Sequence, residues 1–186
     1  MFVFRTKLEK LLSLQEIYND YKSLVFNCAL QYVQNREDAE EITQDVFLSV
    51  HDNLGNFKQN SKLSTWLYRI TINKSIDFLK WRHRKKRYAL LTNLFKREEN
   101  LFFEPKEFNH PGVLLEDKEE LGQLFALINS LPENQKTALI LLKIEDLSQK
   151  EAAEVMQIST KALESLFQRA KINLEKMLLK AKENKK

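Results

Sequence analysis

Apolar residues recur at intervals of three or four along the first half of the chain, which is the spacing of one helix face. The first stripe consists of Ile17, Tyr21, Leu24, Val25, Cys28 and Tyr32. Similar stripes follow at 38–53 and at 64–87, and the polar residues 53–61 between them lack the pattern. The sequence therefore predicts three amphipathic helices, with a loop between the second and the third.

The second half of the chain repeats this pattern in shorter segments. One stripe lies at 121–128 and another at 138–142, and the pair Leu131-Pro132 interrupts the chain between them. Proline is tolerated at the first position of a helix, so a new helix is expected to begin at this break. The chain contains only 3 glycines and 3 prolines, too few for the many turns of a sheet protein. The sequence therefore predicts an all-α fold.

Residues 148–177 follow the pattern of a helix-turn-helix. Ser148 and Glu151 form a capping box that predicts a helix start, and a brief turn at 158–159 precedes a longer helix. The apolar face of that longer helix consists of Leu163, Phe167, Ala170, Leu174 and Met177. Its polar residues are Lys161, Glu164, Ser165, Gln168, Arg169 and Lys171. Such a helix can enter the major groove of DNA, although an ordinary helical hairpin with a solvated face gives the same spacing.

The segment 98–117 has the composition of a linker. It holds two of the three prolines and several acidic residues. We therefore expect two small helical domains, spanning 1–95 and 119–186, joined by a linker at 96–118. The helix-turn-helix falls in the second of these domains.

Charge is distributed unevenly along the chain, although the net charge is only +4. Residues 80–87 contain six basic residues and no acid. Cations of this kind neutralise phosphates, and nearby aromatic side chains such as Trp66 can stack on unpaired bases. The segment therefore favours contact with nucleic acid. The alternative is that Trp66 packs in the core and that the basic residues are merely solvated.

The helix expected at 38–53 has an acidic character. Residues 37–52 carry six acidic residues and no lysine or arginine. A DNA-binding surface gains nothing from such a face, because phosphates repel carboxylates. A protein partner is compatible with it. The residues alone support this interpretation and an ordinary solvated face equally.

The sequence gives little support for catalysis. The 3 histidines are scattered, and no histidine–cysteine metal spacing, glycine-rich phosphate loop or nucleophile motif is present. We therefore expect no enzymatic activity, no metal and no cofactor. The single cysteine, Cys28, excludes an internal disulfide and lies in an apolar stripe, which favours a buried thiol in a cytoplasmic protein. No run of about 18 apolar residues is present, so no membrane insertion is expected.

Two groups of motifs follow one another along the chain. The first half contains DAEEITQDVF from Asp38 and TWLYRI from Thr65. The second half contains LPENQ from Leu131, LSQKEAA from Leu147 and KALESLFQRAK from Lys161. In this order and at this separation, the motifs resemble the extracytoplasmic-function (ECF) group of the sigma-70 family of RNA polymerase sigma factors. The resemblance covers nearly the whole chain except the linker.

The resemblance implies a bacterial initiation subunit that binds core RNA polymerase and directs promoter-specific transcription. It implies that 1–95 is a sigma region 2 domain, which binds polymerase and recognises and melts the −10 element. It implies that 119–186 is a sigma region 4 domain, which recognises the −35 element. The partners would be core polymerase and promoter DNA, both as duplex and as melted strand, and the resemblance allows an anti-sigma factor as well.

The resemblance also assigns candidate residues to each interface. For the −10 element and the melted strand they are Asn56, Lys58, Asn60, Lys62, Trp66, Asn73, Lys74, Asp77, Lys80, Arg82 and Arg84. For the −35 element they are Lys161, Glu164, Ser165, Gln168, Arg169 and Lys171. For core polymerase they are Glu40, Glu41, Gln44, Asp45, Phe47 and Leu48.

Glu164 departs from the pattern, because many members of the group carry a basic residue at that place. A carboxylate cannot bind phosphate or the acceptors of guanine, but it can accept a hydrogen bond from the amino group of cytosine. The usual −35 preference of the group is therefore not expected here.

Two other functions are compatible with parts of the sequence. An ordinary helix-turn-helix regulator with an N-terminal dimerisation or sensor domain would form a homodimer and bind palindromic duplex unaided. A nucleic-acid enzyme would act on DNA as the purified chain, but no catalytic constellation supports it. A sigma factor differs from both, because its specific binding and its effect on initiation would require core polymerase.

Overall fold

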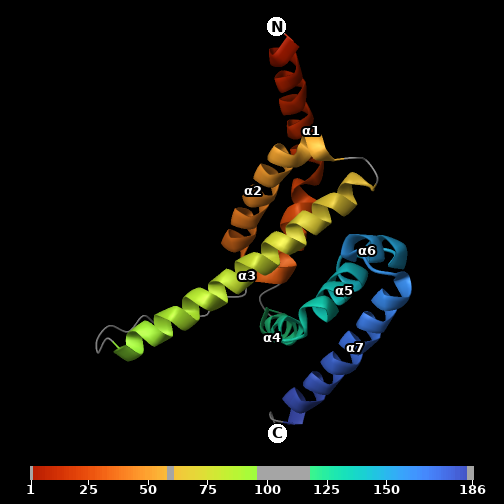
Figure 1. Cartoon of the computed structure of the whole chain (residues 1–186). Helices are drawn as coiled ribbons and strands as arrows, with labels where there is room; N and C mark the ends of the chain where they lie inside the picture. The colour runs from red at the N-terminus through yellow and green to blue at the C-terminus, as the bar shows by residue number, and fades with distance from the viewer. Residues whose placement is uncertain (1, 58–60, 96–117, 184–186) are drawn as a thin grey trace. The chain divides into compact units, whose positions relative to one another are not determined.

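The computed structural model describes residues 2–57, 61–95 and 118–183, which form helices joined by short turns and contain no β-strand. The helices are α1 (Phe2–Val33), α2 (Arg36–Asn53), α3 (Leu63–Phe95), α4 (Lys118–Asn129), α5 (Glu133–Lys143), α6 (Gln149–Met156) and α7 (Thr160–Glu183), and a short 3-10 helix, η1 (Leu54–Asn56), follows α2 (Figure 1). The predicted all-α fold is confirmed. Among the described helices, none combines the length and apolar character that a membrane span needs.

Contacts between Cα atoms divide the chain into two compact units. The first comprises Met1–Asn56 and Ile70–His110, and the second comprises Phe57–Arg69 and Pro111–Lys186. The first turns of α3 therefore count with the second unit. The domain bounds expected from the sequence assign 57–69 to the first domain instead, and those bounds stay a prediction.

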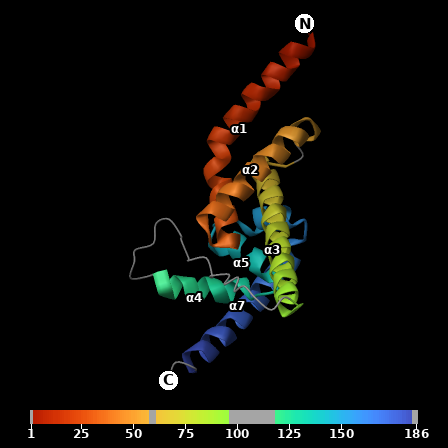
Figure 2. The same cartoon turned by 90° about the vertical axis from the view of Figure 1, so that its left-hand side faces the viewer.

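The core of the first unit lies where α1 packs along α2 (Figure 1). Figure 2 shows the N-terminal part of α1 continuing past α2. The fully buried apolar residues of the two helices include Val25, Cys28, Ala29, Leu30, Ala39, Val46 and Val50. Burial of a side chain as large as Val or Leu contributes about 1.5–3 kcal/mol. The buried thiol of Cys28 confirms the interpretation of this residue as a small core hydrophobe.

A sharp turn with a defined cap connects α1 to α2. Gln34 has a positive φ of 57°, and its backbone N–H donates to the Leu30 carbonyl at 2.9 Å. The next residue, Asn35, has an extended backbone, and its side-chain oxygen accepts from the backbone N–H of Asp38 at 3.0 Å. Asparagine is among the preferred N-cap residues because its side chain satisfies such a donor. The cap therefore fixes where α2 begins and places Asp38 in its first turn.

The second unit has a separate apolar core. Ile128 of α4, Leu131, Leu139 of α5 and Ala170 of α7 are buried together, and α7 packs against both α4 and α5. The stripes expected at 121–128 and within 148–177 thus face one another in a shared core.

Among the described side chains of this unit, one lysine is buried. Lys136 of α5 is 5% exposed, and its Nζ donates to the Oδ1 of Asn129 at 2.6 Å. Burial disfavours the charged ammonium, and this lowers the pKa of Lys136 from 10.5 to about 8, while the nearby carboxylate of Glu133 opposes the shift. The folded chain therefore carries an unfavourable charge at neutral pH.

Replacing this charge with an apolar side chain should stabilise the protein. Because the pKa of Lys136 is lower in the folded chain, the cost of its charge is fully present below about pH 8 and disappears as pH rises through 10.5. We expect Lys136→Met to raise the free energy of unfolding by about 1–3 kcal/mol at pH 7. Urea denaturation at pH 7 and pH 10 measures this, and a gain that does not shrink at the higher pH would contradict it.

Candidate nucleic-acid interface and partner-binding face

A helix-turn-helix is formed by α6 and α7 in the second unit. The predicted capping box is present: the Ser148 hydroxyl accepts from the backbone N–H of Glu151, and the Glu151 carboxylate accepts from the backbone N–H of Ser148. Gln157 ends α6 in the left-handed region, with φ 56°. Ser159 then caps α7, because its hydroxyl accepts from the backbone N–H of Ala162 at 3.2 Å. These local bonds set the turn between the two helices.

The outward face of α7 is polar along its first three turns. All six predicted residues are exposed, namely Lys161, Glu164, Ser165, Gln168, Arg169 and Lys171. On the inward face, Leu163 and Ala170 are fully buried. Ile172, which the sequence also places on the polar face, is 51% exposed and lies just beyond these residues. The helix therefore offers the uninterrupted polar face that entry into a major groove requires.

The basic end of α3 in the first unit combines exposed cations with exposed aromatic rings. Trp81 is 49% exposed and Tyr88 is 75% exposed, seven residues apart on one side of the helix. The Nζ of Lys85 lies 5.1 Å from the centre of the Trp81 ring. The centre of the Phe78 ring lies 5.8 Å from the centre of the same Trp81 ring. Aromatic faces of this kind can stack on bases. The predicted set of contacts names neither Trp81 nor Tyr88, although two aromatic residues seven positions apart at the basic end could have indicated both.

The predicted nucleic-acid contacts on the same part of α3 differ in their exposure. Asn73, Asp77, Lys80 and Arg84 are exposed, and Lys74 is partly buried.

Arg82 has a different environment from that of its neighbours in the basic run. Its Nη1 donates to the Oδ2 of Asp38 at 2.9 Å, and the two residues come from α3 and α2. The Asp38 side chain is only 7% exposed, whereas that of Arg82 is 38% exposed. The structure thus brings Arg82 to a buried carboxylate, a partner that the basic run in the sequence does not indicate.

The predicted contacts that precede Ile70 are described only in part. Lys58 and Asn60 lie outside the described residues, as does the side chain of Asn56. Trp66 is partly buried, and its ring centre lies 5.0 Å from that of Phe57. This packing supports the core interpretation of Trp66 without burying the ring completely.

The segment Phe57–Arg69 also bonds to α6 within the second unit. The Nζ of Lys62 donates to the Oε1 of Glu151 at 2.8 Å, and the Nη2 of Arg69 donates to the Glu154 carbonyl at 2.6 Å. The ammonium of Lys62, a side-chain hydrogen-bond donor, holds the pKa of the Glu151 carboxyl at about 2, below its usual 4.5. The partners are 89 and 85 residues apart, so no local pattern could have predicted these bonds.

The acidic face of α2 is exposed. Glu40, Glu41, Gln44, Asp45 and Leu48 all face solvent, and Leu48 is 64% exposed.

Phe47, which was grouped with these residues, lies in the interior instead. It is 7% exposed, and its ring packs edge-on against that of Tyr18 on α1 with a centroid distance of 4.8 Å. Neighbouring residues of a helix are separated by about 100° of rotation, so Phe47 turns inward while Leu48 turns outward. Phe47 stays a predicted polymerase-binding residue, and its side chain is buried in the structure.

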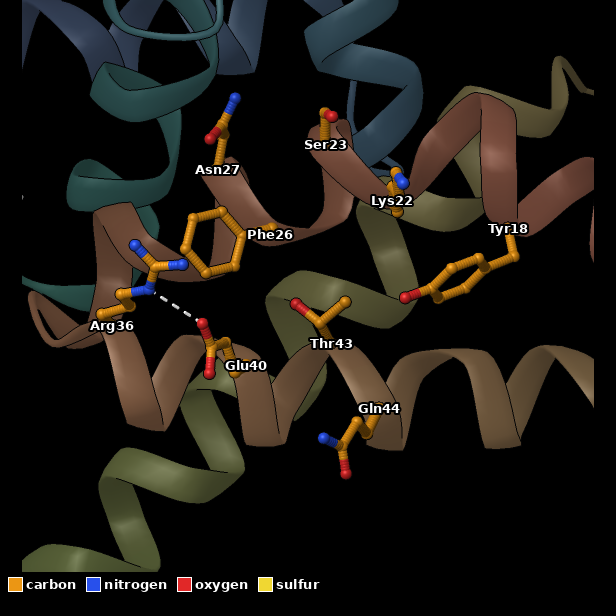
Figure 3. A pocket seen from close by; sticks show the side chains of 9 residues that line it. All are labelled: Tyr18, Lys22, Ser23, Phe26, Asn27, Arg36, Glu40, Thr43 and Gln44. Atoms are coloured by element: carbon orange, nitrogen blue, oxygen red, sulfur yellow. Dashed lines mark hydrogen bonds and ion pairs between the residues drawn. The ribbon is translucent and has the colours of Figure 1, made fainter. Parts of the chain in front are cut away.

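A groove of about 560 Å³ runs between α1 and α2 beside this acidic face. Figure 3 shows the side chains that line it, with the Arg36 guanidinium directed toward Glu40. The two are 2.9 Å apart and both are largely exposed, so the pair contributes little to stability. Lys22 from α1 and Gln44 from α2 also line the groove. The acidic face therefore continues into a groove of mixed lining, in which the rings of Tyr18 and Phe26 lie among polar side chains.

Among the described residues, no group of three or more His, Cys, Asp or Glu side chains has the arrangement of a metal site. The geometry instead consists of three surfaces: a polar helix face on α7, a cationic and aromatic helix end on α3, and an acidic face on α2. Surfaces of this chemistry bind macromolecules, with the first two suited to nucleic acid and the third suited to a protein.

Comparison with known proteins identifies the two units. The family model for sigma-70 region 2 matches residues 17–87, and the model for sigma-70 region 4 matches residues 121–174. The chain is also 31% identical over 163 residues to the RNA polymerase sigma-H factor of Pseudomonas aeruginosa, covering 85% of this chain and 82% of that protein. The chain belongs to the sigma-70 family. Its likeness to the ECF sigma factor SigW of Bacillus subtilis, 29% identity over 88% of this chain and 87% of SigW, supports the ECF group.

A solved structure shares the fold of this sigma factor. It is the sigma factor RpoE in complex with the anti-sigma factor NepR from Bartonella quintana, with a TM-score of 0.59 and 19% identity over 89% of this chain and 96% of that chain. As an ECF sigma factor, the chain binds core RNA polymerase and promoter DNA and directs promoter-specific initiation of transcription. Sigma factors as a class are non-catalytic initiation factors.

The different positions of Phe47 and Leu48 can be tested by truncating each side chain. We expect Phe47→Ala to lower the free energy of unfolding by about 3–5 kcal/mol, because it leaves a cavity between α1 and α2. We expect Leu48→Ala to change it by less than about 0.5 kcal/mol, because the side chain is exposed. Chemical denaturation of both variants measures the difference, and equal effects would contradict the assignment.

Proposed function

We propose that each of the three surfaces binds a different partner during the initiation of transcription. The observation that carries this proposal is the separation of charge within the first unit. The outward face of α2 exposes acidic side chains, while the end of α3 exposes cations and aromatic rings. One of these surfaces repels DNA and the other attracts it, so each suits a different partner. In this proposal 1–95 acts as region 2, 96–118 as a linker and 119–186 as region 4.

The acidic face of α2 binds core polymerase in this proposal. Its exposed residues are Glu40, Glu41, Gln44, Asp45 and Leu48, and Phe47 supports the face from the interior. An exposed leucine among carboxylates matches the composition of protein interfaces, where an apolar centre is surrounded by polar residues. A partner surface with basic side chains would complement it.

The end of α3 holds the −10 element and the melted strand. Asn73, Lys74, Asp77, Lys80 and Arg84 belong to this surface, and the rings of Trp81 and Tyr88 extend it with stacking positions. Asn56, Lys58, Asn60, Lys62 and Trp66 are further candidates from the segment before Ile70. Arg82 is left out of this surface, because its guanidinium binds Asp38.

The polar face of α7 recognises the −35 element in the major groove. Gln168 and Arg169 can donate hydrogen bonds to base edges and phosphates, and the Glu164 carboxylate can accept one. The hydroxyl of Ser165 can donate a hydrogen bond to a base edge or accept one from it. Ile172 lies past these residues and takes no part in base recognition.

The remaining proposals concern partners and location. The chain has no enzymatic activity of its own and uses no metal or cofactor. It acts in the cytoplasm. An anti-sigma factor binds it, by analogy with the complex of the sigma factor RpoE with NepR.

Run-off transcription with purified core polymerase on a pool of random promoters tests the function as a whole. We expect transcripts of defined start only when the chain and core polymerase are both present.

Leu48→Arg should weaken core binding roughly tenfold, because it places a large cation at the centre of the interface. Leu179→Arg, at an exposed leucine on α7, is the matched control. Specific binding to palindromic duplex by a homodimer without core would favour the ordinary regulator instead.

The cationic end of α3 can be tested through the salt dependence of promoter binding by the holoenzyme. Each lost contact to a single-strand phosphate should reduce the slope of log K against log salt by about 0.7. We expect this reduction for Arg84→Gln and again for Lys80→Gln. Lys180→Gln removes the same charge from α7 outside the proposed surfaces and should leave the slope unchanged. Equal slopes for all three variants would contradict the assignment.

The carboxylate of Glu164 gives the −35 site a distinctive preference. We expect selection from a randomised −35 element to enrich cytosine at one position, because its amino group can donate to Glu164. Glu164→Ala should remove that enrichment and weaken discrimination by about 1–3 kcal/mol. Glu175→Ala, further along the same helix and also exposed, is the control. An unchanged base preference for Glu164→Ala would contradict the proposal.

A further inference from the structure

Asp38 is a buried carboxylate at the start of the helix that carries the acidic face. Its side chain is 7% exposed, although the other acids on α2 that form the acidic face are exposed. Burial of a carboxylate is unfavourable unless it is paired and hydrogen-bonded. Arg82 meets this requirement with a charge-assisted bond of 2.9 Å. The first turn of α2 provides further stabilisation, because a negative charge there favours the helix dipole.

We propose that Arg82 is a positioning residue: through Asp38 it holds the first turn of α2, and the polymerase-binding face with it, at a fixed orientation to the DNA-binding part of α3. This inference rests on the proposed function of those two surfaces. Arg82 and Asp38 are 44 residues apart in the sequence and belong to the same unit. The bond therefore connects the two helices directly within one unit.

The position of the bond along α2 determines what it can control. The middle and end of α2 are anchored by buried apolar residues such as Ile42, Val46 and Val50. The first turn contributes Ala39 to the core, together with the bond from Asp38 to α3. Loss of the bond should therefore leave the unit folded but allow the start of α2 to reorient. Glu40 and Glu41 of the acidic face lie immediately after this turn.

The charge of Arg82 is also less available to DNA than that of Arg84. The carboxylate of Asp38 neutralises it at close range, and the Arg82 side chain is only 38% exposed. Arg84 is exposed, two residues away on the same helix. The two arginines of one basic run thus have separate roles: Arg84 contacts phosphate, and Arg82 acts through Asp38.

A double-mutant cycle in the holoenzyme separates these roles. Run-off transcription and the salt dependence of promoter binding are measured for Arg82→Gln, Asp38→Asn and the double variant. Arg84→Gln serves as the comparison for a lost phosphate contact. Asp52→Asn removes a carboxylate from the last turns of the same helix, where the side chain is 75% exposed, and serves as the charge control. The folded fraction of each chain at the assay temperature is measured by circular dichroism.

We expect Arg82→Gln and Asp38→Asn each to lower transcription roughly tenfold, and the double variant to lower it no further, because all three lose the same bond. The salt slope should stay at the wild-type value for these variants and fall by about 0.7 for Arg84→Gln alone. Asp52→Asn should retain wild-type transcription.

Three results would overturn the inference. A reduced salt slope for Arg82→Gln, with normal transcription for Asp38→Asn, would make Arg82 a phosphate contact. Additive losses in the double variant would show that the two residues act separately. Unfolding of either single variant at the assay temperature would make the bond a support of the fold rather than of one orientation. If the wild-type chain itself failed to direct transcription with core polymerase, the proposed function would fail instead.

Discussion

Opposite charges on a small helical unit attract one another, and the first unit must keep them apart. Carboxylates line the outside of α2 and cations line the end of α3, so collapse of one surface onto the other would neutralise both. Packing of α1 against α2 buries the inner face of α2 and leaves its carboxylates on the outer face. The Asp38–Arg82 bond pairs one acidic residue of α2 with one basic residue of α3 and connects the two helices at that point.

This separation of charge explains how a chain of net charge +4 can bind DNA in the cell. Affinity that depends on phosphate neutralisation alone would call for a larger excess of cations. A subunit bound to core polymerase needs fewer cations, because polymerase keeps it close to the promoter at a high effective concentration. In the proposed function the acidic surface serves assembly, and its carboxylates disfavour nonspecific contact of that surface with DNA.

Periodicity and capping were sufficient to predict much of this fold. The helical stripes, the buried Cys28 and the capping box at Ser148 depend on neighbours within a few residues, so the sequence contains their causes. Phe47 and Leu48 show where such reasoning ends, because adjacent residues of one motif face opposite sides of a helix. The bond of Arg82 to Asp38 could not be predicted from the sequence. Nothing in a run of six cations distinguishes the one that meets a carboxylate 44 residues away.

The two tryptophans of the chain have different surroundings, which gives the protein a built-in optical probe. Trp66 is partly shielded beside the ring of Phe57, whereas nearly half of Trp81 is open to water beside the ammonium of Lys85. An indole in water emits at longer wavelength than a shielded one, and a base stacked on it quenches the emission. Fluorescence of the unlabelled protein can therefore follow the proposed strand capture in real time, with the more exposed Trp81 as the more responsive chromophore.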